Sequence, residues 1–313
     1  MGAEADSASQ LLVRELDRGR RLDLFLAERL GLSRSQARRL LARGAVRLDG
    51  RPVTEAAKGV ALEPGSSLEV APFRAPGEER PRAEPEARLA LLAEGPGWLT
   101  IDKPAGVPVH PLAEDETGTV LGAVAARHPE IVGVGEGGLR SGVVHRLDVD
   151  TSGVLLLATQ EPVWQRLRAA FREHRVEKVY RALVAGRLER EGSAELWLVT
   201  ARHRPARVRV LTAAERVRAR GARPCQLAWR PLEVYRTATL VEVRPVTGHL
   251  HQIRAALAHF GHPLLGDRTY APPEVAAAAP RHMLHASSVA FEEITAASPD
   301  PEDFAQIQVG LNF

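Results

Sequence analysis

The first regular pattern of hydrophobic positions in the chain is helical and lies near the N-terminus. Its apolar residues are three or four positions apart, at Leu22, Phe25, Leu26 and Leu30. The glycine that follows can end this helix, and Ser33 with Gln36 has the spacing of a capping box for a second helix over 34–43. An Asp49-Gly50 turn then joins two short strand-like segments. This order predicts two short helices that lead into a tight hairpin.

In the second part of the chain some hydrophobic patterns have the period of a strand and others the period of a helix. Short apolar or alternating runs predict strands over residues 99–101, 154–158, 180–184 and 240–243. Pro162 is suited to a first helical turn, and the apolar positions after it recur at helical spacing as far as Phe171. Residues 253–257 predict a further helix. Strands outnumber helices without strict alternation, so the pattern favours an α+β fold over a doubly wound one.

A proline-rich stretch separates these two parts. Residues 71–88 contain prolines at four positions: Pro72, Pro76, Pro81 and Pro85. Because proline fixes φ and removes a backbone donor, we expect a semi-extended linker here. The predicted organisation is a small α/β module over 18–75, a linker over 71–88 and a larger domain over 89–313. A chain of 313 residues is long enough for one large domain and one small one.

Composition narrows the class of protein. The chain has one cysteine, Cys225, which excludes an intrachain disulfide and a cysteine-based zinc site. No apolar run approaches the roughly 18 residues that a membrane helix needs, and no Gly-x-Gly-x-x-Gly or Walker loop occurs. We therefore expect a cytoplasmic protein without a membrane segment and without a nucleotide cofactor.

The net charge of +3 is unevenly distributed along the chain. Residues 18–52 contain ten arginines and three acidic residues, a local charge of +7 that leaves −4 for the rest. Four of these arginines spread over the polar face of the second predicted helix: Arg34, Arg38, Arg39 and Arg43. A basic module with few aromatic residues favours the phosphates of a structured polyanion over stacking on single strands. A solvated arginine-rich surface is the alternative interpretation.

The densest group of reactive side chains lies between apolar segments over residues 143–153. Asp148 could act there as a lone nucleophile or base. His145, Asp148 and Ser152 could form a hydrolytic triad, although triads normally draw their members from distant segments. Asp148 and Asp150 could form a glycosidase pair, although carboxylates two positions apart on a strand share a face and cannot flank a sugar. A polar turn held by its own hydrogen bonds is the structural alternative.

Several motifs carry a family resemblance that distinguishes these hypotheses. His145-Arg146-Leu147-Asp148 with Thr151-Ser152-Gly153 resembles the signature of ribosomal large-subunit pseudouridine synthases of the RluA type. Four further motifs of that family have counterparts here: DKPAG with VHP in 102–111, KVYRA at 178–182, HQIR at 251–254 and HPLLGDRTY at 262–270. The N-terminal module is similar to the S4 RNA-binding domain at residues 21–23, 33–36 and 46–50. Together the two resemblances cover most of the chain.

The resemblance implies a fold, a reaction and a set of roles. The larger domain would have a mixed, mainly antiparallel sheet and a central cleft. Asp148 would be the catalytic carboxylate, paired with Arg254. Tyr180 would pack on the target uracil and could take the proton lost later from the sugar or base. Arg146 would help to extrude that base from its stack. The partner would be structured RNA, ribosomal RNA favoured over transfer RNA, and the enzyme would act as a monomer without a cofactor.

Two remaining points concern histidine and activity. His249 follows Gly248 where the family usually has arginine. Four histidines in this region suggest a metal site: His249, His251, His259 and His262. No cysteine accompanies them, and the family histidine that matches His251 is structural, so we expect no metal.

An RNA-binding accessory protein with an inactive synthase domain is the second functional hypothesis. The presence of Asp148, Tyr180 and Arg254 favours the enzyme.

Overall fold

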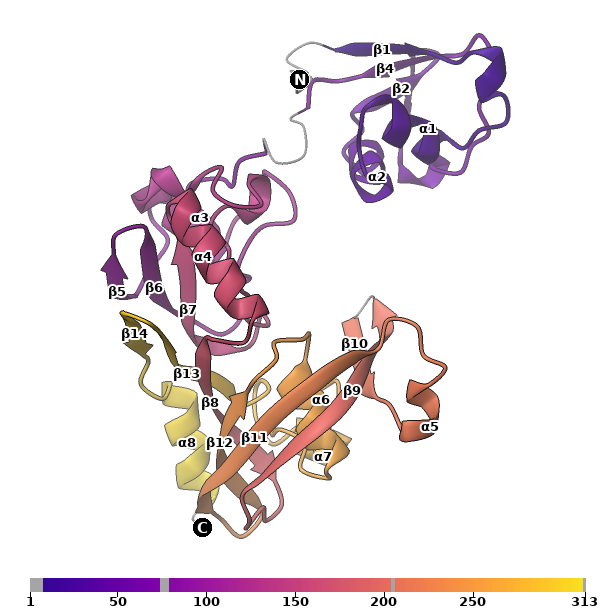
Figure 1. The fold of residues 1–313 in the computed structure, drawn as a ribbon. Coiled ribbons are helices and arrows are strands. Elements are labelled where there is room, and N and C mark those ends of the chain that lie inside the picture. Colours follow the sequence, from indigo (N-terminus) through magenta and orange to yellow (C-terminus); the bar gives the residue numbers. More distant parts are fainter. Residues whose placement is uncertain (1–7, 74–78, 204–205, 312–313) are drawn as a thin grey trace. The chain divides into compact units, whose positions relative to one another are not determined.

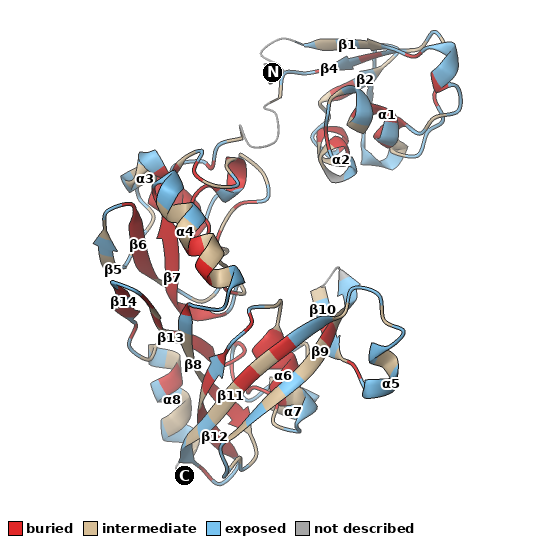
Figure 2. Cartoon of the chain, viewed as in Figure 1, coloured by how far each residue is buried: buried red, intermediate tan, exposed pale blue. Residues whose placement is uncertain are grey.

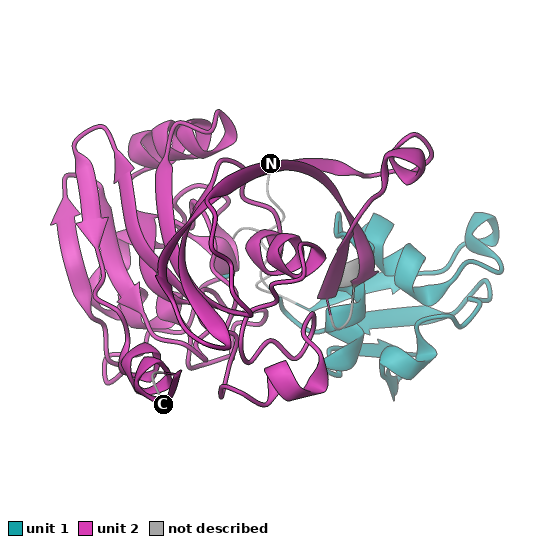
Figure 3. Cartoon of the chain, turned by 90° about the horizontal axis from the view of Figure 1, so that it is seen from below, with its two compact units in different colours: residues 1–79 teal, residues 80–313 magenta. Residues whose placement is uncertain are grey.

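The computed structural model describes residues 8–73, 79–203 and 206–311. The chain forms two compact units, Met1–Glu79 and Arg80–Phe313 (Figure 3). The first unit therefore begins ahead of residue 18, and the second begins inside the proline-rich stretch. Each unit has its own hydrophobic core.

The first unit contains two helices and a small antiparallel sheet. The helices are α1 (Leu22–Arg29) and α2 (Arg34–Ala42). The sheet has the order β1-β4-β2-β3, with β1 Ser9–Leu12, β2 Val46–Leu48, β3 Arg51–Val53 and β4 Ser67–Val70. The predicted capping box is present, since the Gln36 N–H donates to Ser33 Oγ (3.3 Å) and the Ser33 N–H to Gln36 Oε1 (2.7 Å). The predicted helix–helix–hairpin order is confirmed.

The second unit is built on a ten-stranded sheet of order β10-β9-β11-β12-β8-β13-β7-β6-β5, in which β14 pairs with β13 (Figure 1). The strands are β5 Leu91–Gly95, β6 Trp98–Lys103, β7 Ser152–Ala158, β8 Glu177–Ala185, β9 Gly192–His203, β10 Ala206–Val210, β11 Arg223–Val234, β12 Ala238–Pro245, β13 Leu284–Phe291 and β14 Ile294–Ala297. The helices are α3 Val120–Arg127, α4 Glu161–Arg172, α5 Ala213–Arg216, α6 Gln252–His259, α7 Pro273–Ala276 and α8 Glu302–Leu311. Among the described residues only β7 and β13 pair in parallel, which confirms the predicted α+β, mainly antiparallel fold.

The predicted elements of this unit are confirmed, and others were not anticipated. The four predicted strands lie within β6, β7, β8 and β12, and the two predicted helices are α4 and α6. Every residue of β7 is buried, as its continuous apolar run requires (Figure 2). The long strands β9, β11 and β13 have no such clear local pattern. Each pairs with the next strand in sequence and also with a more distant one.

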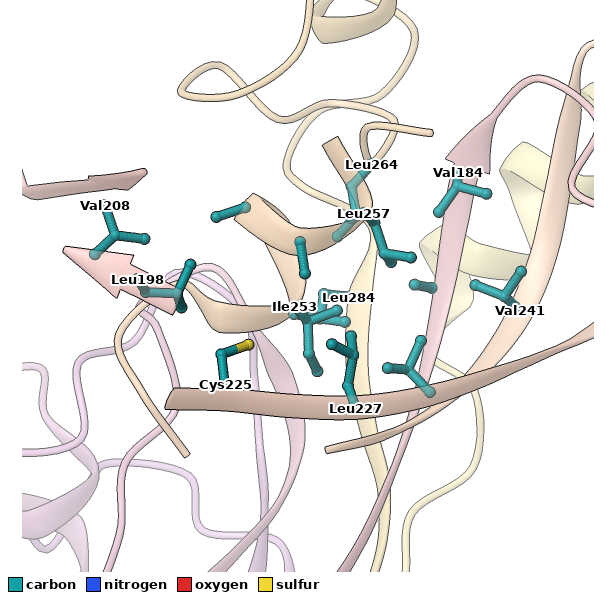
Figure 4. Packing of buried hydrophobic residues seen from close by; sticks show 14 residues of the cluster. Val184, Leu198, Val208, Cys225, Leu227, Val241, Ile253, Leu257, Leu264 and Leu284 are labelled. Atoms are coloured by element: carbon teal, nitrogen blue, oxygen red, sulfur yellow. The ribbon is translucent and has the colours of Figure 1, made fainter. Parts of the chain in front are cut away.

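Two cores support the site from opposite sides. The apolar residues of α4 pack on β7, with Leu167 and Ala170 fully buried. The other core lies where the curved strands β8 to β12 surround α6. In it, Ile253 lies beside Leu227 and Leu284, and Leu257 lies beside Leu264 (Figure 4). Gly153 allows β7 and β13 to approach closely, because its φ is +109° and a Cβ there would lie 2.2 Å from the Ala286 carbonyl oxygen on β13.

The described end of the predicted linker is docked rather than free. Residues 74–78 lie outside the described part of the chain. Beyond them, Glu84 accepts the backbone N–H groups of Gly118 (2.8 Å) and Thr119 (3.4 Å) at the start of α3. Arg127, at the other end of α3, donates to the Ala87 carbonyl (2.7 Å). The prolines exclude regular structure here, but they do not prevent the chain from packing on α3.

Candidate active site

A cleft of about 870 Å³ opens in the second unit. Its walls come from four parts of the chain: residues 143–148, α4, the start of β8 and residues 245–254. Asp148, Tyr180, Arg254 and Arg146 all line it. The structure therefore brings together the four site residues predicted for this domain, although they are up to 108 positions apart in sequence.

The loop that carries Asp148 is held from below by a buried lysine. Lys103 is fully buried, and its Nζ donates to the carbonyl oxygens of Pro104 (2.9 Å), Val107 (2.7 Å) and Val149 (2.7 Å). Burial lowers the pKa of Lys103 to about 8. These bonds fasten the turn after β6 to the residue that follows Asp148. Lys103 therefore shapes the loop and does not face the cleft.

Asp148 belongs to a chain of three charges. Arg254 Nη1 donates to Asp148 Oδ2 (2.9 Å), and Arg254 Nε and Nη2 donate to the two oxygens of Asp267 (2.8 Å each). Asp267 is fully buried, whereas 18% of the Asp148 side chain is exposed. Burial opposes ionisation of Asp267, but the bidentate hydrogen bonds from Arg254 outweigh it and hold its pKa below the usual range. Asp267 thus orients Arg254 toward Asp148.

His251 approaches the same carboxylate oxygen from another direction. Its Nε2 lies 3.7 Å from Asp148 Oδ2, and its Nδ1 lies 3.0 Å from the Tyr270 hydroxyl. That hydroxyl accepts the backbone N–H of Val208 (2.9 Å), so its own proton is available to Nδ1. Burial lowers the pKa of His251 and favours neutral imidazole. Nδ1 is then the acceptor and Nε2–H points at Asp148.

The backbone at His251 is in the left-handed region, with φ +51° and ψ +21°. This conformation is uncommon for residues other than glycine and asparagine, and it places the ring against both Asp148 and Tyr270. Both His251 and Arg254 face Oδ2, and no described residue donates to Oδ1. One oxygen of Asp148 is therefore restrained, while the other is open to the cleft.

Tyr180 lies on β8, half-buried, opposite Val243 of β12 and Ala286 of β13. Burial, and secondarily the charge of Asp148, raises the pKa of Tyr180 above its usual range. The side chain is therefore a neutral phenol at physiological pH. Its ring offers the cleft an aromatic face beside an anionic carboxylate.

The other polar residues of the 143–153 segment have separate structural partners. His145 Nε2 accepts the Leu156 N–H (2.9 Å), and its ring stacks on Phe171 at 4.6 Å. Ser152 Oγ lies 3.0 Å from His285 Nδ1, so the hydrolytic triad does not form. Asp150 is exposed and does not line the cleft, which leaves no second carboxylate for a glycosidase pair. Arg146 is exposed at the cleft and has no ion pair among the described residues.

The histidines of this region do not assemble into a metal site. His249 Nε2 donates to the Pro224 carbonyl (2.7 Å), which explains how a histidine fits where the family usually has arginine. His262 Nδ1 lies 2.9 Å from the Ala185 carbonyl. In the described parts of the chain, no three His, Cys, Asp or Glu side chains are placed to hold a metal ion.

Three of the four predicted RNA-binding arginines lie on α2, in the first unit, and Arg43 follows the last residue of that helix. The Nε atoms of Arg34 and Arg38 both donate to Asp23 Oδ2 (3.0 Å each), and Arg21 donates to both oxygens of the same carboxylate. Burial opposes ionisation of Asp23, but these hydrogen bonds hold its pKa below the usual range. Arg43 is exposed at the end of α2, and Arg39 is half-buried. Asp23 was not predicted, although it belongs to the Arg21-Leu22-Asp23 motif.

The second unit thus has an arginine-bound carboxylate in a cleft, and the first unit has a group of exposed arginines. The chain belongs to the RNA pseudouridylate synthase family: residues 97–259 match that family and residues 20–63 match the S4 domain. Its resemblance to both, predicted from sequence, is confirmed. In the described residues, no helix has the length and apolar character required to cross a membrane.

Several known proteins are similar to this chain. An uncharacterized RNA pseudouridine synthase of Chloroflexus aurantiacus is 34% identical over 85% of this chain and 80% of its own. The ribosomal large subunit pseudouridine synthase D of Haemophilus influenzae is 32% identical over 92% of this chain and 90% of its own. The structure of human RNA pseudouridylate synthase domain containing 1 has a TM-score of 0.56 at 24% identity, covers 70% of this chain and 86% of its own, and supports the fold.

Proposed function

We propose that this enzyme converts specific uridines of large-subunit ribosomal RNA to pseudouridine, with Asp148 as the catalytic carboxylate. The observation that carries the proposal is Asp148 in the cleft, held at Oδ2 by Arg254 and open at Oδ1. The names of relatives such as the Haemophilus influenzae synthase D support ribosomal RNA as the substrate. The RNA-binding accessory role is disfavoured, because the carboxylate, its cation and the aromatic face are all in the cleft.

The reaction requires the protein to supply charged groups and to position the substrate. The C1′–N1 bond of uridine breaks, the uracil turns, and a C1′–C5 bond forms while C5 loses a proton and N1 gains one. The product is an isomer of the substrate, so no oxidation or reduction takes place. Asp148 acts through Oδ1, as the nucleophile at C1′ or as the base that removes a ribose proton. Arg254 holds a guanidinium 2.9 Å from this carboxylate and orients it toward the substrate.

Tyr180 and Arg146 act on the target base, which Tyr180 contacts and whose place in the stack Arg146 fills. The target nucleotide must leave its stack, at a cost of a few kcal/mol. Arg146, exposed two residues before Asp148, can enter the vacated position and offset part of that cost. Tyr180 packs on the uracil while it is detached from ribose, as a neutral phenol because its pKa is raised by burial.

The organisation of the chain supports a division of labour. The unit at residues 1–79, with its arginines on α2, binds RNA, and the unit at 80–313 carries the whole catalytic set. Since one chain supplies every site residue, we propose that the enzyme acts as a monomer. With ribosomal RNA as its substrate, we propose that the enzyme works in the cytoplasm.

The test uses an unmodified large-subunit rRNA transcript with tritium at C5 of uridine, since isomerisation releases that label to water. Asp148→Asn keeps the size of the side chain and removes its charge, so we expect tritium release to fall roughly 10²–10⁴-fold with RNA binding retained. Asp150→Asn, in the same loop but outside the cleft, is the matched control and should stay within about twofold of wild type. A tenth of the wild-type rate in Asp148→Asn would remove Asp148 from this role.

A further inference from the structure

A second concentration of arginine lies in the catalytic unit, far in sequence from the N-terminal module. Residues 200–224 contain eight arginines and one acidic residue, Glu215, a local charge of +7. Residues 18–52 also carry +7 and the whole chain +3, so the remaining residues carry −11. The arginines of residues 200–224 are therefore not part of a generally basic surface.

We call residues 200–224 the arginine arm. It consists of the end of β9, the edge strand β10, helix α5 and the start of β11 (Figure 1). Arg204 lies outside the described residues. The other arginines of the arm are all exposed: Arg202, Arg207, Arg209, Arg216, Arg218, Arg220 and Arg223.

Most of this charge is not neutralised by the residues that the structure describes. Arg209 pairs with Glu215 (2.7 Å). Arg216 and Arg207 lie over the rings of Trp197 (4.1 Å) and Tyr270 (5.7 Å). The remaining four have no side-chain hydrogen bond or ion pair among the described residues: Arg202, Arg218, Arg220 and Arg223. Like charges gathered in this way repel one another and favour a polyanionic partner.

The arm is anchored to the wall of the cleft at its base. The Pro224 carbonyl accepts from His249 Nε2 (2.7 Å), and the Gln226 N–H donates to Thr247 Oγ1 (3.1 Å). On the other strand of the arm, the Val208 N–H donates to Tyr270, which contacts His251 (3.0 Å). His249, Thr247 and His251 all line the cleft. The arginine arm therefore continues directly from the wall of the cleft.

We propose that the arginine arm binds phosphates of the RNA backbone next to the target nucleotide. The proposal rests on the proposed function only in taking RNA as the substrate. A guanidinium matches the geometry of a phosphate, and a row of phosphates suits cations that are spread over two strands and a helix. Because the arm contributes no group to Asp148, it acts on affinity and not on the chemical step.

The experiment compares two double variants of the full chain. Arg218→Gln with Arg220→Gln removes two unpaired charges from the arm. Arg190→Gln with Arg236→Gln is the control, since both are exposed, unpaired among the described residues, and at the other end of β9 and β11. Filter binding to an unmodified large-subunit rRNA transcript is measured over a range of salt concentrations, and tritium release gives KM and kcat.

In the arm variant we expect weaker binding, a raised KM and an unchanged kcat. The slope of log affinity against log salt should become shallower by about 1.4–1.8, since each phosphate contact contributes about 0.7–0.9. A charge-preserving pair, Arg218→Lys with Arg220→Lys, should keep the wild-type slope. Equal slopes in the arm variant, the control and the wild type would overturn the proposal and would leave an acidic protein as the candidate partner.

Binding is measured independently of turnover, so the two proposals can fail separately. If the transcript is never modified but the arm variant loses salt dependence, the arm binds RNA and the proposed substrate is wrong. If Asp148→Asn abolishes modification while the arm variant behaves as wild type, the catalytic proposal holds and the arm has no part in RNA binding.

Discussion

A cluster of carboxylate and guanidinium groups lies in each unit. In the catalytic unit the carboxylates outnumber the guanidinium groups, and in the first unit the guanidinium groups outnumber the carboxylates. In the catalytic unit the buried cation Arg254 lies between two carboxylates. In the first unit the buried carboxylate Asp23 lies among Arg21, Arg34 and Arg38. The first arrangement leaves a carboxylate oxygen of Asp148 facing the cleft, and the second leaves guanidinium groups facing solvent.

The difference shows how the buried partner determines the function of the exposed one. Arg254 is only 7% exposed and is held by three hydrogen bonds, so it orients Asp148 without reaching the substrate. Arg34 is 47% exposed, and only its Nε is bound to Asp23, so its Nη groups can reach a phosphate. In the catalytic unit the buried cation orients an anion that can act in catalysis. In the first unit the buried anion orients cations that can bind RNA.

The largest effect is expected when the catalytic cluster loses its cation. Arg254→Met keeps the apolar stem but leaves Asp148 and the fully buried Asp267 without a partner, at a cost of about 3–5 kcal/mol. We expect severe loss of turnover by tritium release and a lower unfolding temperature. Arg254→Lys keeps the charge but cannot make the forked contact with Asp267, so its activity should lie between those of wild type and Arg254→Met. Wild-type turnover in Arg254→Met would disprove the pairing.

A smaller effect is expected from His251, which faces the same oxygen of Asp148. His251→Asn tolerates the left-handed backbone but is too short to reach Asp148. Loss of about 1 kcal/mol of restraint corresponds to roughly fivefold in kcat, with KM little changed. Tyr270→Phe should have the same direction of effect, since its hydroxyl acts through His251 Nδ1. If the two losses add fully in the double variant, the hydrogen-bonded relay is wrong.

A substitution of Asp23 tests the cluster of the first unit and should leave catalysis unchanged. Asp23→Asn removes the charge that gathers three arginines, so we expect weaker binding of long structured RNA and a less stable first unit, with kcat at saturation unchanged. Because the pKa of Asp23 is depressed, its stabilising effect is present above the unfolded value of about 3.9 and is lost as pH falls below it. The difference in unfolding midpoint between wild type and variant should therefore shrink below pH of about 4. A difference that persists at lower pH would contradict the ion-pair explanation.

The smallest effect is expected from the exposed arginine that follows α2. Arg43→Gln removes a cation that has no ion pair among the described residues, so stability should change by less than about 0.5 kcal/mol. If Arg43 binds phosphate, the salt dependence of RNA binding should become shallower by about one unit. An unchanged slope would make Arg43 part of a solvated surface.

Local signals predicted those parts of the fold that depend on neighbours in sequence. The helices of the first unit, the Ser33 capping box and the Asp49-Gly50 turn each follow from residues within four positions of one another. The buried run of β7 was equally plain. In contrast, β9, β11 and β13 were not predicted, because their sequences lack a clear local pattern and each also depends on a partner strand that is not its neighbour in sequence.

Within the site, the sequence by itself determined the chemistry that is available: a lone Asp148, an aromatic residue at 180, an arginine at 254 and no cysteine partner for a metal. It also contained the arginines of residues 200–224, whose charge is visible in the composition but whose location beside the cleft is not. The tertiary structure alone decided that Asp267 holds Arg254, that Lys103 is buried beneath the loop, and that Asp148 has one restrained oxygen and one open oxygen. The physical reason is that a charge can be buried only where its partners converge, and those partners come from segments that meet only in the folded chain.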